Sequence, residues 1–448
     1  MKKTFVFILV LLSLLSIVVT ASGEEFEIDS KYAAVYNLEQ KKFLFEKEAN
    51  TIIYPASLTK IMTGILACDY YEALGGNDFY VTVSADVLEN VSGNKMGLCA
   101  GERVSFYDLI CALLVGSAND AAYVIAETVG GSVESFVSMM NERAAKLGAH
   151  NTNYSNPSGF HSPYMYTTLF DQALICAHAA EKTKLLEISS LVSYEMTETD
   201  MSGKRTFTNQ NLLFDAKHWL RHYTPNTRGL NVGMTSEAGW CLATVYDNDG
   251  LTNIVLVSGG RVEKFEYHYL NDAKALMKYT ADKFDFITLL DSNKAMCDVE
   301  VELGRDKDRL LLATSRDITA LLPIDIDKNT DVKIEYTLSK DTFTAPIEEG
   351  EVFGTVSAFY KGELVGSVEL VATTDVKMSI PLFILDKISS FFKIPLVKAL
   401  VSLILSLLFA FCCGAFIYVN VKRRRRLKER RRALAKSVSH ARKNINKY

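Results

Sequence analysis

The sequence has few cysteines, and none of them is paired in a motif. Eight cysteines are spread over 448 residues, and no Cys-x-x-Cys pair or Cys/His cluster with metal-ligand spacing occurs. Disulfide frameworks are typical of small secreted domains, and structural zinc sites need clustered ligands, so neither organises this chain. We therefore expect no metal and no cofactor, and we expect most cysteines to be small core residues.

The sequence also lacks internal repeats and long low-complexity linkers. Its content of 48% apolar and 23% charged residues is ordinary for a folded protein. A chain of 448 residues is too long for one ordinary domain. These features predict two folded domains with further segments at the two ends.

The N-terminus has the pattern of a secretory signal peptide. Residues 1–3 carry two lysines, residues 4–20 form an uncharged apolar run, and small residues follow. A charged start, an apolar core and a small-residue cleavage site define such peptides, so we predict one over residues 1–21. An uncleaved anchor is the alternative, but the run is near the lower limit for crossing a bilayer.

The C-terminus has the pattern of a membrane span followed by a basic tail. Residues 399–419 contain no charged side chain, and at about 1.5 Å per residue they are long enough to cross the hydrocarbon layer. Residues 420–448 contain 13 Lys or Arg and 1 Glu, a net charge of +12. Basic flanks stay in the cytoplasm. We therefore expect a single-pass protein of the cell membrane, with the folded body outside and the tail inside.

The basic tail could also indicate nucleic-acid binding. Its position directly after the apolar run favours a role in topology and in contact with anionic lipid. Because the whole chain carries a charge of −4, the residues before the tail sum to about −16, which is unlike a nucleic-acid binder. The expected partner is the membrane, with no nucleic acid.

The central part of the chain mixes helical and strand patterns, and the later part is all-β. Apolar spacing predicts helices over 57–74, 106–115 (with Ser105 as N-cap), 120–129 and 133–147, and strands over 32–36, 42–45, 240–246 and 252–257. Short apolar runs at 310–313, 332–336 and 354–359 predict a small β-sandwich over 296–375. Residues 380–395 could lie on the membrane surface as an amphipathic segment.

A serine and a lysine one helical turn apart carry the main chemical signal. Ser57 and Lys60 are at i and i+3, so they share one face of a helix. Serine is a poor nucleophile until a base takes its proton, and a lysine whose pKa is lowered by burial can be that base. The spacing is weak evidence by itself, because two other pairs share it: Ser92/Lys95 and Ser390/Lys393. The preceding proline and the helix that follows distinguish Ser57.

A second signal, Ser117-Ala118-Asn119, lies between two predicted helices. Serine and asparagine can relay a proton and hold an amide group. The same pattern recurs at residues 92–94, so it is also weak alone. Asn119 has an alternative role as a helix N-cap, which is compatible with catalysis.

The two motifs in this order are typical of penicillin-binding proteins and serine β-lactamases. Longer stretches resemble the D-alanyl-D-alanine carboxypeptidase family over roughly residues 31–393; they include YPASLTKIMTGILA, LLVGSANDAAYVIAE, NERAAKLGAHNTNYSNPSGF, TNQNLL and EAGWCLAT. The resemblance implies an α/β (α+β) penicillin-binding or serine β-lactamase-like transpeptidase domain over residues 25–287. The small all-β sandwich and a transmembrane helix would follow it.

The resemblance also implies roles for single residues. Ser57 would be the acylated nucleophile and Lys60 its base, with Ser117 and Asn119 as the second catalytic element. The backbone N–H groups of Ser57 and Met234 would form the oxyanion hole. The implied substrate is the D-Ala-D-Ala terminus of a peptidoglycan stem peptide, and β-lactams would act as inhibitors.

The third motif of the family, Lys-Thr-Gly in a strand, is altered in this chain. The aligned residues are Asn231, Val232 and Gly233, followed by Met234 and Thr235. A cation and a hydroxyl that would bind the substrate carboxylate are thus missing, and one charge-assisted hydrogen bond is worth about 1.5–3 kcal/mol. We assign substrate binding to the strand through Asn231, Gly233, Met234 and Thr235, with weakened recognition of the carboxylate.

Three neighbouring observations limit this interpretation. Arg228 could replace the lost cation, but residues 228 and 231 of a regular strand face opposite sides. No Glu-x-x-Leu-Asn motif lies between Asn119 and Asn231, which argues against a class A β-lactamase. His161 is assigned a structural role. Two functions therefore remain. One is a carboxypeptidase with full or reduced activity. The other is a degenerate homologue that binds penicillin or peptidoglycan or has a regulatory role.

Overall fold

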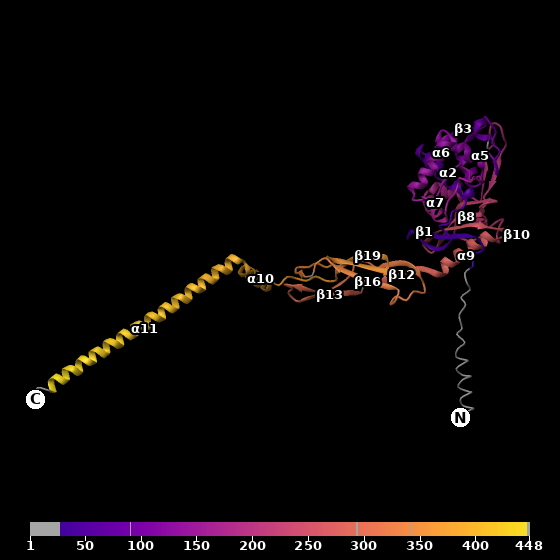
Figure 1. Ribbon diagram of the computed structural model, residues 1–448. Coiled ribbons are helices and arrows are strands. Elements are labelled where there is room, and N and C mark those ends of the chain that lie inside the picture. Colours follow the sequence, from indigo (N-terminus) through magenta and orange to yellow (C-terminus); the bar gives the residue numbers. More distant parts are fainter. Residues whose placement is uncertain (1–26, 90, 293, 341, 446–448) are drawn as a thin grey trace, which may run out of the picture. The chain divides into compact units, whose positions relative to one another are not determined.

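The computed structural model describes residues 27–445 except 90, 293 and 341, with side chains described as far as residue 438 (Figure 1). The predicted signal peptide lies outside the described residues. The chain separates into two compact units that divide after Asp285. Each unit is described by itself below.

The first unit is built on an antiparallel sheet with the strand order β2-β1-β9-β8-β7. Its strands are β1 (Tyr32–Asn37), β2 (Lys42–Lys47), β7 (Thr227–Thr235), β8 (Gly239–Asn248) and β9 (Leu251–Gly260). The N-terminal strand β1 pairs with β9, so the two ends of the unit meet in one sheet. Strand β7 is at the edge, which leaves half of its backbone polar groups without a neighbouring strand.

Helices cover both faces of this sheet. They are α2 (Thr59–Ala73), α3 (Ala85–Leu88), α4 (Phe106–Leu114), α5 (Asn119–Gly130), α6 (Val133–Lys146), α7 (Leu169–Glu181), α8 (Thr183–Ser189) and α9 (His268–Lys283). Alternate residues of a strand face opposite sides: Ala243 and Val245 join the core of α2, α4 and α5, whereas Trp240 stacks on Tyr269 of α9 with ring centroids 5.0 Å apart. Figure 1 shows α9 across the sheet from α2 and α7.

Short elements connect the sheet and the helices. They are the 3₁₀ turns η1 (Ala56–Leu58) and η2 (Leu212–Phe214) and the paired strands β3 (Tyr80–Thr82) with β4 (Arg103–Ser105), β5 (Ser193–Met196) with β6 (Arg205–Thr208), and β10 (Val262–Glu263) with β11 (Glu266–Tyr267). The predicted helices and strands of this unit are confirmed with shifted ends. The Ser105 cap is confirmed too, since its Oγ accepts a hydrogen bond from the Asp108 N–H at 3.1 Å.

One local prediction was wrong, and one alternative role is not observed. Ser57 does not begin an α-helix: it lies in η1, and α2 begins at Thr59. The cause is Ala56, whose φ of 47° is incompatible with a right-handed helix. Asn119 is not the N-cap of α5, because Ala118 occupies that position without a side-chain cap and Asn119 is the first helical residue.

The second unit begins with an all-β region. It contains a six-stranded sheet in the order β16-β18-β19-β14-β13-β17 and a two-stranded sheet of β12 and β15. The strands are β12 (Phe284–Leu290), β13 (Ala295–Glu302), β14 (Arg309–Thr314), β15 (Ile318–Pro323), β16 (Val332–Leu338), β17 (Phe343–Thr344), β18 (Val352–Tyr360) and β19 (Glu363–Ala372). Buried residues such as Leu312, Phe353 and Val356 form a separate core. The predicted all-β region is confirmed.

Two helices follow the β region. Helix α10 (Ile380–Lys393) has no buried residue, and Lys387 Nζ lies 5.1 Å from the ring centroid of Phe383. Helix α11 (Pro395–Ile445) contains the predicted span. Residues 395–438 are long and apolar enough to cross a membrane, with a mean hydropathy of 2.6 in their most apolar stretch. Helix α11 is therefore a candidate membrane anchor.

Candidate active site

Gly159 packs against the turn that carries Ser57. Ala56 has positive φ, so η1 bends the chain sharply before α2. Gly159, itself at a φ of 79°, packs so closely under this turn that a side chain there would collide with the carbonyl of Ala56. Ser57 is half-buried at the end of this bend. The strained turn thus presents the Ser57 hydroxyl at the edge of the helical core.

Lys60 lies one turn after Ser57 and is completely buried. Its Nζ is 3.1 Å from the Ser57 Oγ and donates a second hydrogen bond to the backbone carbonyl of Ser158 at 2.6 Å. Burial lowers the pKa of Lys60 to about 7. A substantial fraction of the amine is therefore uncharged near neutral pH and able to accept the serine proton.

The loop that includes Ser158 was not predicted as part of the site. The Asn156 Oδ1 accepts hydrogen bonds from the N–H groups of Ser158 (3.1 Å) and Gly159 (2.8 Å), which folds the loop into a tight turn. The Thr63 Oγ1 on α2 donates to the carbonyl of Pro157 at 2.6 Å. The Asn-Pro-Ser-Gly composition indicates a turn, but nothing in it identifies a carbonyl that would bind Lys60.

Ser117 and Asn119 connect α4 to α5, and both helices pack on α2. Ser117 is buried at a φ of 52°. Gly116 beside it has no room for a side chain, because a Cβ there would be 2.9 Å from the ring of Phe207 on β6. The Asn119 Nδ2 donates to the carbonyl of Ser92 at 2.6 Å. The side chain that was expected to cap α5 is therefore bound to a different loop.

Strand β7 passes directly beside the nucleophile. A Cβ at Gly233 would lie 2.5 Å from the backbone nitrogen of Ser57 and 2.7 Å from its Cβ. Only glycine permits this approach, so the glycine of the third motif is where the resemblance places it. Met234 follows it and is 53% exposed, and the Thr235 Oγ1 accepts a hydrogen bond from the Ala238 N–H at 3.0 Å.

Asn231 is on the same strand but has a different environment. Its side chain is 3% exposed, and its Oδ1 accepts a hydrogen bond from the Val232 N–H at 2.7 Å. Its Nδ2 is buried and makes no hydrogen bond within the described part of the chain. Residue 231 has the same parity as Gly233, so it projects from the face of β7 that meets Ser57. A neutral amide thus stands where the family motif has a lysine.

Arg228 is engaged elsewhere. Its Nη2 forms an ion pair with the Asp247 Oδ2 at 2.6 Å, and the side chain is 47% exposed. The pairing of β7 with β8 is irregular between Arg228 and Asn231, so the strict alternation that we used for these two residues does not run through this part of the strand. The ion pair is the stronger reason that Arg228 does not replace the missing cation.

His161 lies closer to the site than its assigned structural role indicates. It lines a narrow hollow together with Ala56 and Thr235. Its Nδ1 is 3.7 Å from the Glu237 Oε2, and its ring meets Tyr54 edge-on at 4.8 Å between centroids. A histidine on the loop after Gly159 therefore lies near the turn before Ser57 and near the end of β7, which sequence spacing could not indicate.

The cysteines are free, and most of those in the first unit are buried. Cys68, Cys111, Cys176 and Cys241 are buried and free, Cys297 is half-buried, and Cys99, Cys412 and Cys413 are exposed. Burial raises the pKa of both Cys68 and Cys111 to about 12, so these thiols stay protonated and unreactive. Among the described residues, no group of three or more His, Cys, Asp or Glu side chains is placed to hold a metal ion.

The chain matches two family models. Residues 18–261, more than half of the chain, match the model of the D-alanyl-D-alanine carboxypeptidase family. Residues 284–378 match the model of the penicillin-binding protein 5 C-terminal domain. The first matched region contains the five-stranded sheet and helices α2 to α8 with Ser57, and the second contains the all-β region.

Individual relatives agree with the family models. The chain is 28% identical over 358 residues to D-alanyl-D-alanine carboxypeptidase DacF of Bacillus subtilis, covering 78% of this chain and 86% of the relative. It is 29% identical over 340 residues to the carboxypeptidase DacA of Haemophilus influenzae, covering 72% and 79%.

Solved structures share the fold. Penicillin binding protein 5 from Haemophilus influenzae has a TM-score of 0.58 at 27% identity, covering 78% of this chain and 98% of the other. Penicillin binding protein 6B from Escherichia coli has a TM-score of 0.59 at 23% identity, covering 77% and 96%, and shows the fold alone. Family models, relatives and fold agree, and the chain belongs to the D-alanyl-D-alanine carboxypeptidase family.

Proposed function

We propose that this protein is a serine-type D-alanyl-D-alanine carboxypeptidase that acts on peptidoglycan stem peptides through an acyl-enzyme at Ser57. One observation carries the proposal: the Lys60 Nζ is fully buried, has a pKa of about 7 and lies 3.1 Å from the Ser57 Oγ. A serine hydroxyl in contact with an uncharged amine is an activated nucleophile. The names of the relatives supply the substrate.

The reaction follows from this pair. The neutral Lys60 amine takes the proton of Ser57 as the Oγ attacks the carbonyl carbon of the penultimate D-alanine. The negative charge on the carbonyl oxygen is stabilised by the N–H groups of Ser57 and Met234. The bond to the terminal D-alanine breaks, its nitrogen receives a proton relayed through Ser117, and water then hydrolyses the ester. Asn119 orients the amide groups of the substrate.

The substrate-binding strand is expected to hold the terminal carboxylate weakly. Gly233 keeps β7 against Ser57, and Thr235 follows the proposed oxyanion donor. Asn231 brings a neutral amide and Val232 an apolar side chain, where the family has a cation and a hydroxyl. The residues proposed for the covalent step are thus all present, whereas binding of the substrate's terminal carboxylate is weakened. Reduced activity, rather than altered chemistry, is the expected consequence.

The alternative function is that of a degenerate homologue that binds penicillin or peptidoglycan without useful turnover. The observation that supports this alternative is the replacement of the motif residues at 231 and 232. The relatives are named as carboxypeptidases and the Ser57–Lys60 pair is intact, so this alternative is not favoured. It would appear experimentally as acylation by penicillin without release of D-alanine from peptides.

The decisive experiment is mass spectrometry of the protein without its C-terminal helix after incubation with benzylpenicillin. We expect a single covalent adduct that peptide mapping places on Ser57. Ser57→Ala should lose the adduct, whereas Ser92→Ala and Ser390→Ala should retain it. The same protein should release D-alanine from a D-Ala-D-Ala peptide. An adduct on Ser92 or Ser390 would contradict the assignment of the nucleophile.

We also propose an arrangement at the membrane. The catalytic domain (25–287) and the β domain (296–375) would be extracellular, residues 380–395 would lie on the outer surface, residues 399–419 would span the membrane, and residues 420–448 would be cytoplasmic. The +12 charge of the tail supports this orientation. Protease added to intact protoplasts should digest the domains and spare the tail. Protection of the domains would overturn the orientation.

A further inference from the structure

The first half of residues 92–98, a segment that we call the strap, is hydrogen-bonded to the second motif through Ser92 and Asn94. The Asn94 Nδ2 donates to the carbonyls of Gly116 (2.6 Å) and Ser117 (3.2 Å). In return, the backbone N–H of Asn119 donates to the Asn94 carbonyl at 2.8 Å, and the Asn119 Nδ2 donates to the Ser92 carbonyl at 2.6 Å. The strap contains the Ser92-Gly93-Asn94 sequence that imitates the motif, and it lies against the true one.

Asp120 fixes the second half of the strap. Its carboxylate is 1% exposed and accepts hydrogen bonds from the N–H groups of Met96 (2.8 Å), Gly97 (2.9 Å) and Leu98 (3.1 Å). Asp120 is also in the first turn of α5, where the helix dipole favours a negative charge. The beginning of α5 and the strap therefore form one hydrogen-bonded body, with Asn119 between them.

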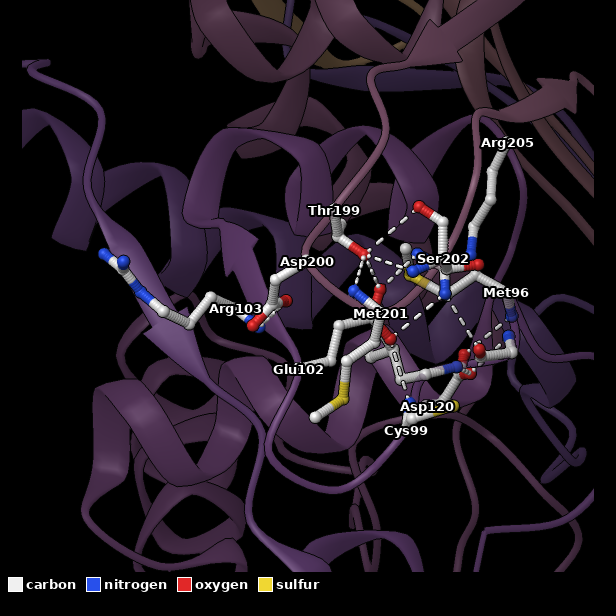
Figure 2. A network of polar contacts seen from close by, with 12 residues as sticks. Met96, Cys99, Glu102, Arg103, Asp120, Thr199, Asp200, Met201, Ser202 and Arg205 are labelled. Atoms are coloured by element: carbon white, nitrogen blue, oxygen red, sulfur yellow. Dashed lines mark hydrogen bonds and ion pairs between the residues drawn. The ribbon is translucent and has the colours of Figure 1, made fainter.

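A second anchor comes from β6, about 100 residues further along the chain. Arg205 donates from Nη1 to the Glu102 Oε1 (2.7 Å), and from Nη2 to the Glu102 Oε2 (3.1 Å) and the carbonyl of Gly97 (2.9 Å). Figure 2 shows the Arg205–Glu102 pair beside Asp120. The Thr199 Oγ1 also donates a hydrogen bond to the Glu102 carboxylate, at 2.7 Å. Arg205 therefore binds both the strap, through the Gly97 carbonyl, and Glu102, which immediately precedes β4.

The charges of this pair are buried. Glu102 is completely buried and the Arg205 side chain is 10% exposed. Burial opposes ionisation of Glu102, but hydrogen bonds from Arg205, Thr199 and the Cys99 N–H outweigh it, so the pKa of Glu102 is lowered. The carboxylate is thus ionised at neutral pH, and its bonds to Arg205 are charge-assisted. A pair of this kind holds its neighbours in one geometry.

We propose that Arg205 is a positioning residue for Asn119, acting through the strap. The proposal rests on the proposed function, since it assigns Asn119 to the acylation step. Ser117 has an unfavourable positive φ, and the strap binds the carbonyl of that residue and of Gly116. Such strain persists only where the surroundings enforce it. Without the Arg205 anchor the strap relaxes, and misplacement of Asn119, which donates two hydrogen bonds to the strap, by a fraction of an ångström slows acylation.

The test compares three variants by the second-order rate constant of acylation by benzylpenicillin and by Tm. Arg205→Met removes all three anchoring hydrogen bonds and should lower the rate about tenfold. Arg205→Lys keeps the charge beside Glu102 but not the three-bond fork, and should restore part of the rate. Asn94→Ala changes an exposed side chain, so it should fold normally and also lose about tenfold. An unchanged rate in both Arg205→Met and Asn94→Ala overturns the proposal.

Arg143→Met is the matched control. Arg143 pairs with Asp69 at 2.6 Å, with both side chains about three-quarters buried, and Asp69 is ten residues into α2 from Thr59, about 15 Å along the helix. This variant should lower Tm as Arg205→Met does and leave acylation within twofold. Equal loss of acylation in both variants would mean that Arg205 acts only through overall stability.

A double-mutant cycle with Asn119 gives the sharpest result. If Arg205 acts through Asn119, Arg205→Met should change the acylation rate less than twofold in an Asn119→Ala background. Independent roles would multiply, so the full tenfold effect would persist there. The outcome is separable from the proposed function: a natural protein that forms no adduct at Ser57 contradicts that function, whereas normal acylation with an additive cycle contradicts only the role of Arg205.

Discussion

The turn that carries Ser57 and the edge strand β7 lie in contact but contribute to the site in different ways. The first provides side chains: the Lys60 Nζ is bound to both Ser57 and Ser158 in a buried pocket. The second provides backbone and the absence of a side chain, because Gly233 is pressed against Ser57. In the proposed mechanism the two regions thus separate bond-making from recognition of the substrate.

This difference explains where the sequence has changed. Lys60 is completely buried and its partners are fixed, so a replacement there would remove the base and leave the Ser158 carbonyl unpaired. On β7 the features that the proposed mechanism needs are the close approach of Gly233 to Ser57 and the backbone N–H of Met234, and neither depends on the side chains at 231 and 232. The strand can therefore lose its cation and hydroxyl while the fold and the covalent chemistry remain. The predictions below test this separation.

The largest effect is expected from Lys60→Met. Methionine has nearly the same length and suits a buried position, but it cannot accept a proton. General-base catalysis contributes about 10²–10⁴-fold, so we expect acylation by benzylpenicillin to fall about a thousandfold. We expect only a small change in Tm, because the removal of a buried amine is offset by the Ser158 carbonyl that loses its donor. Acylation within tenfold of the natural protein would show that another group activates Ser57.

The next effect is expected from Gly233→Ala. The new Cβ would lie 2.5 Å from the Ser57 nitrogen, so β7 and η1 must separate. Displacement of reacting groups by about 1 Å can cost about 10²-fold, and we expect a loss of this size in acylation. Gly203→Ala is the control, since a Cβ there meets nothing within 4 Å. If the two alanine variants acylate equally fast, the contact between β7 and Ser57 is not required for catalysis.

The sequence could predict the elements and the nucleophile pair because these depend on local spacing. Residues at i and i+3 of a helical turn share one face, and two strand-like runs around a polar turn indicated β8 and β9. The Ser158 carbonyl could not be predicted, because a backbone acceptor leaves no signature in residue type. The bend at Ala56 was missed for a related reason: alanine favours helices, and its positive φ is imposed by the packing of Gly159.

The second motif shows the same limit. Ser117 and Asn119 were proposed from their spacing, and the alternative role of Asn119 as the N-cap of α5 is not observed because its side chain binds the strap. The strap itself was dismissed as a chance repeat of two motifs, since residues 92–95 contain the right residue types in the wrong context. Only the tertiary contacts with Asp120 indicate that residues 92–98 support the second motif and are not a second copy of it.

An intermediate effect is expected from restoring the third motif. The double substitution Asn231→Lys with Val232→Thr returns a cation and a hydroxyl to β7, and we expect kcat/KM for a D-Ala-D-Ala peptide to rise at least about tenfold, the equivalent of ~1.4 kcal/mol. The gain should be absent for a peptide with a C-terminal amide, which has no carboxylate to bind. Equal gains on both peptides would contradict a role in carboxylate recognition. Tm should be recorded, because residue 231 is buried.

A similar effect is expected from pH. Lys60 has a pKa of about 7 because burial disfavours its charged form, and only the neutral amine accepts a proton. The rate of acylation should therefore be constant well above pH 7 and fall as pH decreases through 7, with about a tenfold loss at pH 6. In the Asn231→Lys/Val232→Thr variant the decline should move to lower pH, since a second cation further disfavours protonated Lys60. A profile that is flat from pH 6 to 8 would contradict Lys60 as the base.

The smallest effect is expected from Arg228→Met. If Arg228 had replaced the missing cation, its removal would lower kcat/KM for a D-Ala-D-Ala peptide by about tenfold or more, the value of one charge-assisted hydrogen bond. The structure instead pairs it with Asp247 at 2.6 Å on the half-exposed surface, where such pairs contribute about 0–1 kcal/mol. We therefore expect less than a twofold change in kcat/KM and a Tm shift matched by Asp247→Asn. A tenfold loss in Arg228→Met alone, with Asp247→Asn unchanged, would show that the guanidinium leaves its partner to bind the substrate. The division between a complete covalent region and a depleted recognition strand would then no longer hold.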